Sequence, residues 1–387
     1  MTRRTTLEHL ARPRTADAGV EVAAVEDRSV QITWRDLPPG RVRVGAGGSA
    51  VDVEHPGGPG AAEVTGLPAG RQVVVWVRSG GSVIARRMVR TLFRPPGEEL
   101  FRFATVNDLH LGRGEDGMHG KLRAVDLEAA HHPYVAARDA VAEAIDWGAE
   151  LLVVKGDIVD ETRDHTWELT AKVFTDVPVP VRMLPGNHDT GLRRHFAPEE
   201  GAARHGLVLT RGVEHLDVPG LRVVLMESGL DGNGWGRVAR HAREVADLVA
   251  GAPGGTGTFV ATHHQAQRFR VPLYWPHGIP GPDARSFART VAGTGRGVLV
   301  SSGHTHRNRR RTVGGLTWTE VGATNHFPGV WAGYRVFEGG ILQTVRRITS
   351  PETLAWTDET RDVLRGVWAL WATGTLWDRC FSLRWDR

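Results

Sequence analysis

Five short polar blocks carry the residue types that bind metal ions and move protons. In chain order they read NDLHLG, GDIVDE, PGNHDTG, ATHHQ and GHTH. Carboxylate, amide and imidazole side chains are metal-type ligands, and imidazole also transfers protons near neutral pH. The candidate residues in these blocks are Asp108, His110, Asp157, Asn187, His188, Asp189, His263, His264, His304 and His306.

Each block follows a short apolar run that reads as a buried strand, namely FRFATV, ELLVVK, VPVRML, GTFVAT or GVLVSS. His304 and His306 are one residue apart, so their side chains project to the same side of an extended segment. Taken singly, each block could equally be a turn, a helix cap or a satisfied histidine. Strand ends converge on one edge of a sheet, where α/β proteins place their sites, so five such blocks together predict one composite site.

The elements that must position these blocks change in character along the chain. We expect residues 1–15 to be a flexible tail. Residues 16–98 contain short period-two segments separated by the turns LPPG, HPGGPG and LPAG, which predict a small β-sandwich. In residues 99–345, apolar strands alternate with helical stretches such as 133–146 and 237–250, which is typical of layered α/β sheets.

Residues 346–387 form a carboxyl-terminal extension that holds five of the 13 tryptophans. A stripe of apolar residues predicts a helix over about residues 359–372, and Trp368 and Trp371 lie on this stripe. We expect the helix to dock on the core, with a partner-binding face as the alternative.

Composition excludes several classes of protein. Hydrophobic residues make up 41% of the chain and charged residues 24%, as in ordinary soluble globular proteins. We see neither a membrane span nor a secretory signal, and the one cysteine, Cys380, excludes an internal disulfide and fits a cytoplasmic protein. The excess of arginine over lysine is typical of a bacterial protein. With a net charge of only +4, we do not expect a nucleic-acid partner, although the run from Arg307 to Arg311 could contact phosphates rather than form a solvated hairpin.

The ordered series D-x-H, G-D, G-N-H-D, H and G-H-x-H resembles the calcineurin-like metallophosphoesterases over about residues 100 to 345. The resemblance implies a four-layer αββα sandwich. Within this superfamily the blocks LPGNHD and THHQ are most similar to bacterial class III cyclic-nucleotide phosphodiesterases and glycerophosphodiesterases. The first region resembles a fibronectin type III-like module, as in purple acid phosphatases. Their tyrosine ligand has no counterpart in GDIVDE, which argues against a purple type of site.

The resemblance also implies two metal ions, Mn, Fe or Zn, bridged by a carboxylate and a hydroxide. By position, the first ion would be held by Asp108, His110, Asp157 and His306. The second would be held by Asp157, Asn187, His263 and His304. We prefer His263 to His264 because the family's ligand comes first in the comparable His-x-Pro pattern, although Gln265 stands here where proline is usual.

Proton transfer and substrate selection involve further candidates. His188 follows a ligand and could protonate the leaving oxygen, with Asp189 either orienting it or capping a helix or turn. The segment 265–285 is rich in aromatic residues, proline and arginine, and either selects the substrate or is a packed loop. The candidate substrate contacts are His264, Arg268, Tyr274 and Trp275.

We therefore predict a hydrolase that cleaves a small soluble phosphodiester, of the cyclic-nucleotide or glycerophosphodiester class, by attack of a metal-bridging hydroxide. One alternative is a phosphomonoesterase or nucleotidase of the same fold, since motifs fix chemistry better than substrate. Another is a metal-poor binding scaffold without catalysis. We expect no membrane partner, and the sequence leaves a homo-oligomer open.

Overall fold

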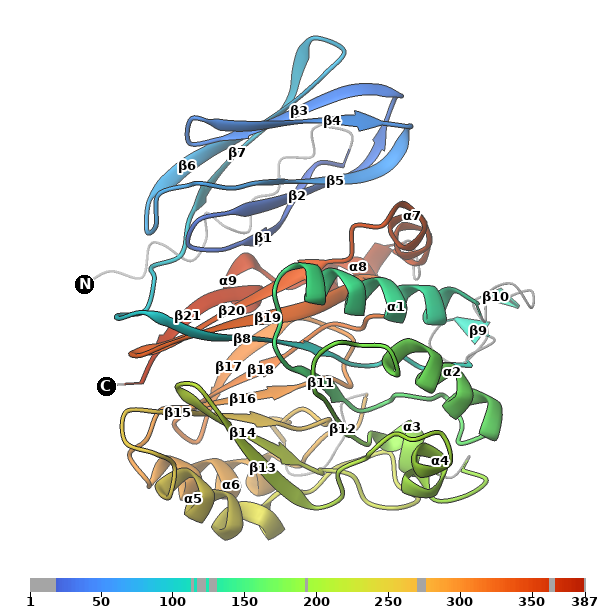
Figure 1. Ribbon diagram of the computed structural model, residues 1–387, viewed down its shortest axis with the longest axis vertical. Coiled ribbons are helices and arrows are strands. Elements are labelled where there is room, and N and C mark those ends of the chain that lie inside the picture. Colours follow the sequence, from blue (N-terminus) through green and yellow to red (C-terminus); the bar gives the residue numbers. More distant parts are fainter. Residues whose placement is uncertain are drawn as a thin grey trace.

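The computed structural model describes residues 19–112, 115–116, 123–124, 131–191, 194–269, 276–361 and 366–385 (Figure 1). The tail expected over residues 1–15 and the candidates Tyr274 and Trp275 lie outside these ranges. Within the described ranges, no helix combines the length and the apolar character that a membrane crossing needs.

An all-β region comes first in the chain and stands at the top of Figure 1. Its two antiparallel sheets enclose a core in which Trp34 is buried. The three-stranded sheet has the order β1 (Glu21–Val25), β2 (Val30–Leu37), β5 (Gly58–Val64). The four-stranded sheet has the order β4 (Ser49–His55), β3 (Gly40–Ala46), β6 (Gln72–Ser79), β7 (Ser82–Arg90). The prediction of an all-β region ahead of the α/β part is confirmed.

Two six-stranded sheets form the centre of the molecule. The first has the order β12 (Val181–Leu184), β11 (Leu152–Lys155), β8 (Glu99–Val106), β19 (Val330–Phe337), β20 (Gly340–Arg347), β21 (Cys380–Arg384). The second has the order β13 (Val213–Val218), β14 (Leu221–Met226), β15 (Gly257–Ala261), β16 (Val298–Ser302), β18 (Leu316–Glu320), β17 (Arg309–Val313). Strands β8, β11 and β12 are parallel to one another, and so are β14, β15, β16 and β18. All five polar blocks therefore follow strands of a parallel set.

Helices cover the outer faces of both sheets, as Figure 1 shows. Helices α1 (His131–Asp146) and α2 (Asp164–Phe174) pack on the first sheet, and α5 (Ala242–Ala250) and α6 (Gly281–Ala292) pack on the second. A third apolar cluster, which includes Phe103, Phe259 and Tyr334, fills the space between the sheets. The short helices are α3 (Asn187–Thr190), α4 (Pro198–Arg204) and a 3-10 turn at Ala239–His241. These layers form the expected αββα sandwich.

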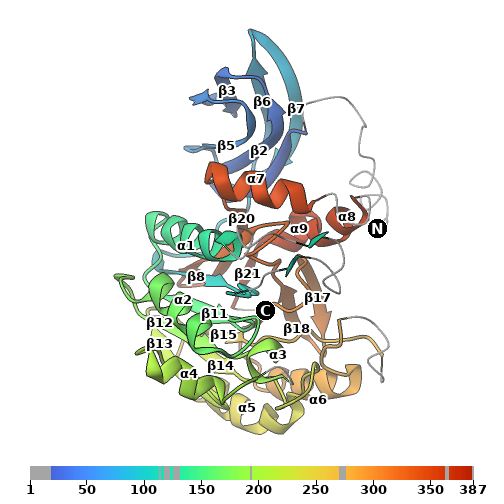
Figure 2. The ribbon, with the colours of Figure 1, turned by 90° about the vertical axis from the view of Figure 1, so that its right-hand side faces the viewer.

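The carboxyl-terminal segment differs from its predicted form. The single helix expected over 359–372 is wrong: α7 (Pro351–Thr360) and α8 (Val367–Thr373) are separate helices, followed by α9 (Leu376–Arg379). Gly366 precedes α8 at a φ of 79°, a left-handed conformation that a continuous α-helix cannot contain. In Figure 2, α7 lies directly below the all-β region and α8 and α9 lie beside the first sheet. The chain then adds β21 as an antiparallel edge strand next to β20.

Candidate metal centre

The ligand candidates sit where strands of both sheets end. Asp108 and His110 follow β8, Asp157 follows β11, His263 follows β15, and the GHTH block follows β16. In the described part of the chain, five non-glycine residues have a positive φ, between 47° and 66°. They are Asp108, His110, Asp157, His304 and His306. Such conformations are costly and cluster at functional sites, so the backbone singles out ligand candidates independently of their side chains.

Two glycines leave room for the site. A Cβ on Gly156, whose φ is 82°, would lie 2.5 Å from Nδ1 of His263 and 2.7 Å from the backbone nitrogen of Gly186. A Cβ on Gly186 would collide with Oδ1 and the backbone nitrogen of Asp157. Gly156 and Gly186 are therefore needed, because the two ligand-bearing loops approach each other without space for a side chain.

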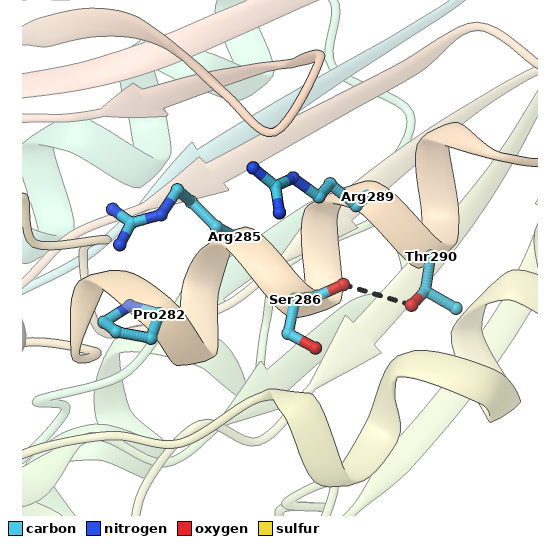
Figure 3. Close-up of a pocket in the computed structure, with 5 residues that line it drawn as sticks. All are labelled: Pro282, Arg285, Ser286, Arg289 and Thr290. Carbon is cyan, nitrogen blue, oxygen red and sulfur yellow. Dashed lines mark hydrogen bonds between the residues drawn. The ribbon is translucent and has the colours of Figure 1, made fainter.

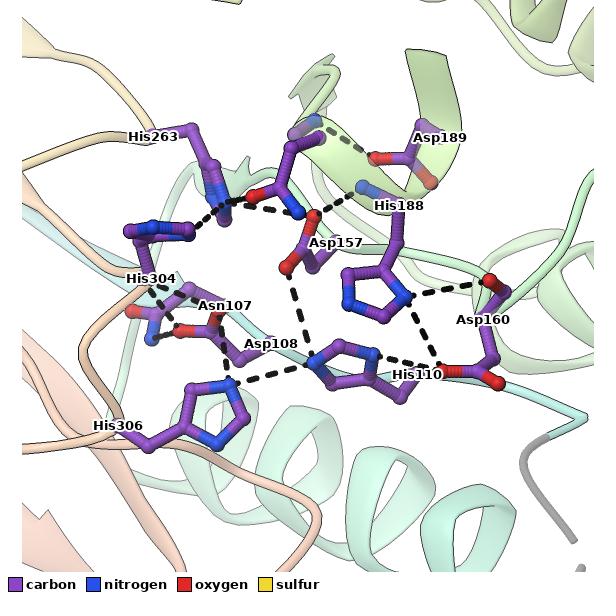
Figure 4. A network of polar contacts seen from close by, with 12 residues as sticks. Asn107, Asp108, His110, Asp157, Asp160, His188, Asp189, His263, His304 and His306 are labelled. Carbon is purple, nitrogen blue, oxygen red and sulfur yellow. Dashed lines mark hydrogen bonds and ion pairs between the residues drawn. The ribbon is translucent and has the colours of Figure 1, made fainter. Parts of the chain in front are cut away.

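The first group of ligand atoms contains Asp108, His110, Asp157 and His306, with all four ligand atoms within 4.8 Å of one another (Figure 4). The Nε2 atoms of His110 and His306 are 3.2 Å apart. Nε2 of His306 lies 3.4 Å from Oδ1 of Asp108, and Nε2 of His110 lies 3.7 Å from Oδ2 of Asp157.

The second group surrounds Nε2 of His263. This atom lies 3.1 Å from Oδ1 of Asn187 and 3.2 Å from Nδ1 of His304. It is also 3.3 Å from Oδ1 of Asp157. The two carboxylate oxygens of Asp157 thus face different groups, as Figure 4 shows. This arrangement suits a carboxylate shared by two metal ions.

Hydrogen bonds on the outer side of the imidazoles test whether these residues fit metal ions. Nδ1 of His263 faces the carbonyl of Lys155 at 2.9 Å, and Nε2 of His304 faces the carbonyl of His277 at 3.0 Å. A carbonyl only accepts, so each outer nitrogen carries a hydrogen, and in the neutral ring each inner nitrogen presents a lone pair. Nδ1 of His110 likewise faces Oδ1 of Asp160 at 3.2 Å. Lone pairs that converge at 3.1–3.4 Å repel one another unless a cation lies between them, so the donor set fits metal ions.

Electrostatics favour the same interpretation. Burial raises the pKa of Asp157, but the imidazoles of His263 and His188 outweigh it and hold the pKa well below its usual range. Burial lowers the pKa of His263, yet the Asp157 carboxylate raises it overall to about 9. Burial and the neighbouring His263 lower the pKa of His304 to about 3. The buried carboxylates of Asp108 and Asp157 therefore need a positive charge beside them. A proton on His263 or a metal ion can supply this charge.

A model of the calcineurin-like phosphoesterase family matches residues 101–308 of this chain. The match covers more than half of the 387 residues. The chain belongs to this family. It is a metal-dependent hydrolase of phosphate esters, as the sequence predicted.

Solved structures of similar fold include two phosphatases. A purple acid phosphatase from seeds of yellow lupin (Lupinus luteus) is 11% identical, with 94% of this chain and 74% of that chain covered and a TM-score of 0.47. A dimetal phosphatase from Danio rerio is 13% identical, with 65% and 99% covered and a TM-score of 0.46. No curated protein matches this sequence significantly. The family assignment therefore depends on the family model alone.

His188 lies at the rim of the calcineurin-like centre. Its side chain is 31% exposed, whereas those of His110 and His263 are buried. Nδ1 of His188 lies 3.2 Å from both the carbonyl oxygen and Oδ1 of Asp160. Of the two roles left open for Asp189, the orienting contact with His188 is thus made by Asp160. Asp189 instead accepts hydrogen bonds from the backbone nitrogens of Ile158, Val159 and Gly186 and ties the two ligand loops together.

Both members of the histidine pair are close to the second group. His264 lies within 4.8 Å of His263 and His304 by its ligand atom. Its Nδ1 contacts Oγ of Ser228 at 2.9 Å, and its buried Nε2 has no hydrogen-bond partner among the described residues. His263 alone of the pair contacts Asn187 and Asp157. The geometry therefore supports His263 as the ligand. Arg268, a candidate substrate contact, is exposed.

Two polar residues of the site, Asp160 and Asn107, had no role predicted from the sequence. Asp160 orients both His110 and His188, and burial raises its pKa while contacts with these imidazoles lower it far more. Asn107 donates to Oδ2 of Asp108 at 2.6 Å and to the carbonyl of Gly322 at 3.0 Å. Asp160 lies three residues after Asp157 in GDIVDE, so its spacing offered a signal. Asn107 offered none beyond its position before Asp108.

A surface pocket of about 450 Å³ lies on α6, away from these residues (Figure 3). It is lined by Pro282, Arg285, Ser286, Arg289 and Thr290 and contains none of the ligand candidates. In the run from Arg307 to Arg311, the last three residues begin β17 and the first two precede it. Arg307 and Arg311 pair with the buried Glu320, and Arg310 stacks on Trp377, so the run is not simply solvated.

Proposed function

We propose that this enzyme hydrolyses a small soluble phosphodiester, of the cyclic-nucleotide or glycerophosphodiester class, with two metal ions, Mn, Fe or Zn. The observation that carries the two-ion proposal is the position of Asp157, whose two oxygens face two separate groups of ligand atoms. The proposed ligands are Asp108, His110, Asp157 and His306 for one ion and Asp157, Asn187, His263 and His304 for the other. When bound, such ions neutralise phosphate charge and activate water at neutral pH.

His188 is the proposed acid of the reaction. Its contact with the carbonyl of Asp160 places a hydrogen on Nδ1, and the Asp160 carboxylate stabilises the protonated ring. Nε2 of the protonated ring can then deliver a proton to the oxygen that leaves phosphorus. Asp157 accepts a hydrogen bond from the backbone nitrogen of His188 at 2.9 Å, which fixes the backbone of His188 relative to both ligand groups.

The charge of the site supports a diester as substrate. Among the described residues, the side chains that contact the inner ligand atoms are carboxylates, an amide and imidazoles, without a guanidinium. A phosphodiester carries one negative charge where a monoester carries up to two, so it needs less additional positive charge. The sequence also supports the proposal of a similarity to class III phosphodiesterases and of a bacterial cytoplasmic setting.

We also propose that the chain divides at about residues 98 and 345. The first boundary coincides with the start of β8 at Glu99, the first strand of the central sheets. The second falls within β20, two residues before its end at Arg347, and β21 later returns to the same sheet. A homo-oligomer remains part of the proposal only as an open alternative.

A hydrolysis panel with the manganese-loaded protein tests the function. It compares a nitrophenyl phosphodiester, a nitrophenyl phosphomonoester, cyclic AMP and glycerophosphodiesters, with the Asp157→Ala variant as the negative control. We expect preference for diesters, and loss of both activity and metal retention in the variant. A preference for monoesters would move the enzyme to the phosphatase alternative. An active, metal-loaded Asp157→Ala variant would contradict the bridging role.

A further inference from the structure

The loop 325–328 supports one ligand candidate from behind. Nε2 of His326 lies 2.6 Å from Nδ1 of His306, and the two ring centroids are 4.7 Å apart. Nε2 of His306 faces Asp108, so Nδ1 is the outer nitrogen of this imidazole. His326 is itself buried. It therefore fixes the ring orientation of His306, and by accepting a hydrogen from Nδ1 it would leave Nε2 of His306 free for a metal ion, a task that a carboxylate or carbonyl performs for most metal-binding histidines.

Helices α7 and α8 hold this loop in place through three hydrogen bonds. Nε1 of Trp356 donates to the carbonyl of Asn325 at 2.8 Å. The backbone nitrogen of Phe327 donates to Oγ1 of Thr360 at 2.9 Å. Nε1 of Trp368 donates to the carbonyl of Phe327 at 3.3 Å, and the Trp368 ring lies 5.8 Å from that of His326. Each residue that flanks His326 is thus bonded to the carboxyl-terminal segment.

Helix α8 also contacts the chain on the other side of His306. The backbone nitrogen of Asn308 donates to the carbonyl of Ala372 at 2.9 Å, and its side chain donates to the carbonyl of Thr373 at 3.3 Å. The guanidinium of Arg307 lies 4.5 Å over the ring of Trp371. The two residues after His306 and the loop behind it are therefore both supported by one helix.

We infer that α7 and α8 are a positioning element of the metal centre, with His326 as the positioning residue for His306. This inference rests on the proposed function, because it assumes that His306 is a metal ligand. If α7 and α8 only packed on the core, they would stabilise the fold, and their contacts would not be concentrated on one of the two ligand groups. Here the contacts converge on His306, which belongs to the group of Asp108 and His110 and not to that of His263.

Calorimetric titration of the full chain with Mn²⁺, after removal of metal, tests the inference. We expect His326→Ala to weaken one of two binding steps by about 10–100-fold, as loss of an outer hydrogen bond typically does. In His326→Gln, an amide oxygen can accept from Nδ1 of His306 in place of the lost nitrogen, so we expect that step to recover. The matched aromatic control is Trp377→Phe, because Trp377 is 72% exposed and stacks on Arg310 rather than on this loop.

A second variant keeps the test informative if His326→Ala does not fold. Thr360→Val removes the acceptor for Phe327 while preserving shape, and we expect it to weaken the same step to a smaller degree. Unchanged affinities in folded His326→Ala, equal weakening of both steps, or failure of His326→Gln to recover would each overturn the positioning role. Wild-type protein that takes up no Mn²⁺ would overturn the proposed function itself, and this result is read before any variant is compared.

Discussion

Individual ligand residues contribute backbone conformation as well as side-chain chemistry. Five of them have a positive φ, and a non-glycine residue in such a conformation costs about 1–3 kcal/mol. A domain is stable by only about 5–15 kcal/mol, so this strain is a substantial fraction of the total. The residue types were predictable from the sequence because imidazole and carboxylate blocks are conspicuous. Their conformation was not, since Asp and His only adopt a positive φ more often than most residues do.

The role of each carboxylate near the ligands depends on side-chain contacts that the spacing of residues in the sequence does not reveal. Asp189 and Asp160 both lie within three residues of a ligand, and the sequence offered Asp189 either as the partner of His188 or as a helix or turn cap. In the structure Asp189 is fully buried beneath the loops, while Asp160 reaches both His188 and His110. Only the path of the loop after β11 decides between the two carboxylates.

Replacement of His188 by alanine tests its role as an acid. We expect metal content to remain and turnover of esters with poor leaving groups to fall by about 10²–10⁴-fold, because those oxygens need a proton as they leave. Turnover of nitrophenyl esters should fall much less, since nitrophenolate leaves without needing a proton. Steady-state rates on a series of leaving groups measure the difference. Equal slowing across the series would count against the acid role.

At the scale of elements, the strands were the most predictable feature. All five apolar runs before the polar blocks end at the ligand loops as strands of the central sheets. Helix α1, expected over 133–146, spans His131–Asp146. The helix expected over 359–372 failed because its apolar stripe continues past Gly366, where the backbone turns left-handed. Side-chain periodicity reports which face is buried, but it does not report such a break.

Because the loops after β11 and β12 are in close contact, one added methyl group between them should lower both stability and metal affinity. In Gly186→Ala, the new Cβ would meet Oδ1 and the backbone nitrogen of Asp157, so the loops after β11 and β12 must separate. Overpacking of this kind costs about 1–3 kcal/mol, and the displaced Asp157 should lower metal affinity as well. Chelator competition and thermal unfolding measure both effects.

The control for this substitution is Gly254→Ala. No atom lies within 4 Å of a Cβ on Gly254, so the same added methyl group meets open space there. We expect its metal affinity to equal that of the wild type. Tight metal binding by Gly186→Ala would show that the two ligand loops can separate without disturbing Asp157, contrary to the packing described above.

For the whole molecule, the sequence predicted the regions but not how they dock. The all-β region contacts the first central sheet through β1 and β20, while α7 contacts β5 and α9 contacts β1. Residues more than 300 positions apart meet there, such as Gln31 with Arg347 and Asp27 with Arg335. Such pairings depend on which surfaces face each other after folding, and neither periodicity nor motif spacing contains that information.

Arg335 on β19 is the residue that tests this docking. It pairs with Asp27 of the all-β region and donates to Oε2 of Glu99 at 3.0 Å, and its side chain is only 8% exposed. In Arg335→Ala the fully buried Asp27 would lose this partner. Breaking a buried pair from one side costs about 3–5 kcal/mol, so we expect a clear loss of unfolding free energy at pH 7. Denaturant titration measures it, with Arg41→Ala as the control at an exposed pair, where we expect no change.

The pH dependence of this effect follows from Glu99. Burial raises the pKa of Glu99, but hydrogen bonds from Arg335 and Arg102 outweigh it and hold the pKa below its usual range. A carboxylate with a lowered folded-state pKa stabilises the protein above its unfolded pKa of about 4.3, and this stabilisation is lost as the pH falls through the lower value. The difference between wild type and Arg335→Ala should therefore be constant from pH 6 to pH 7 and shrink below about pH 4. A difference that stays constant down to acid pH would mean that Arg335 stabilises the docked regions by packing rather than by charge.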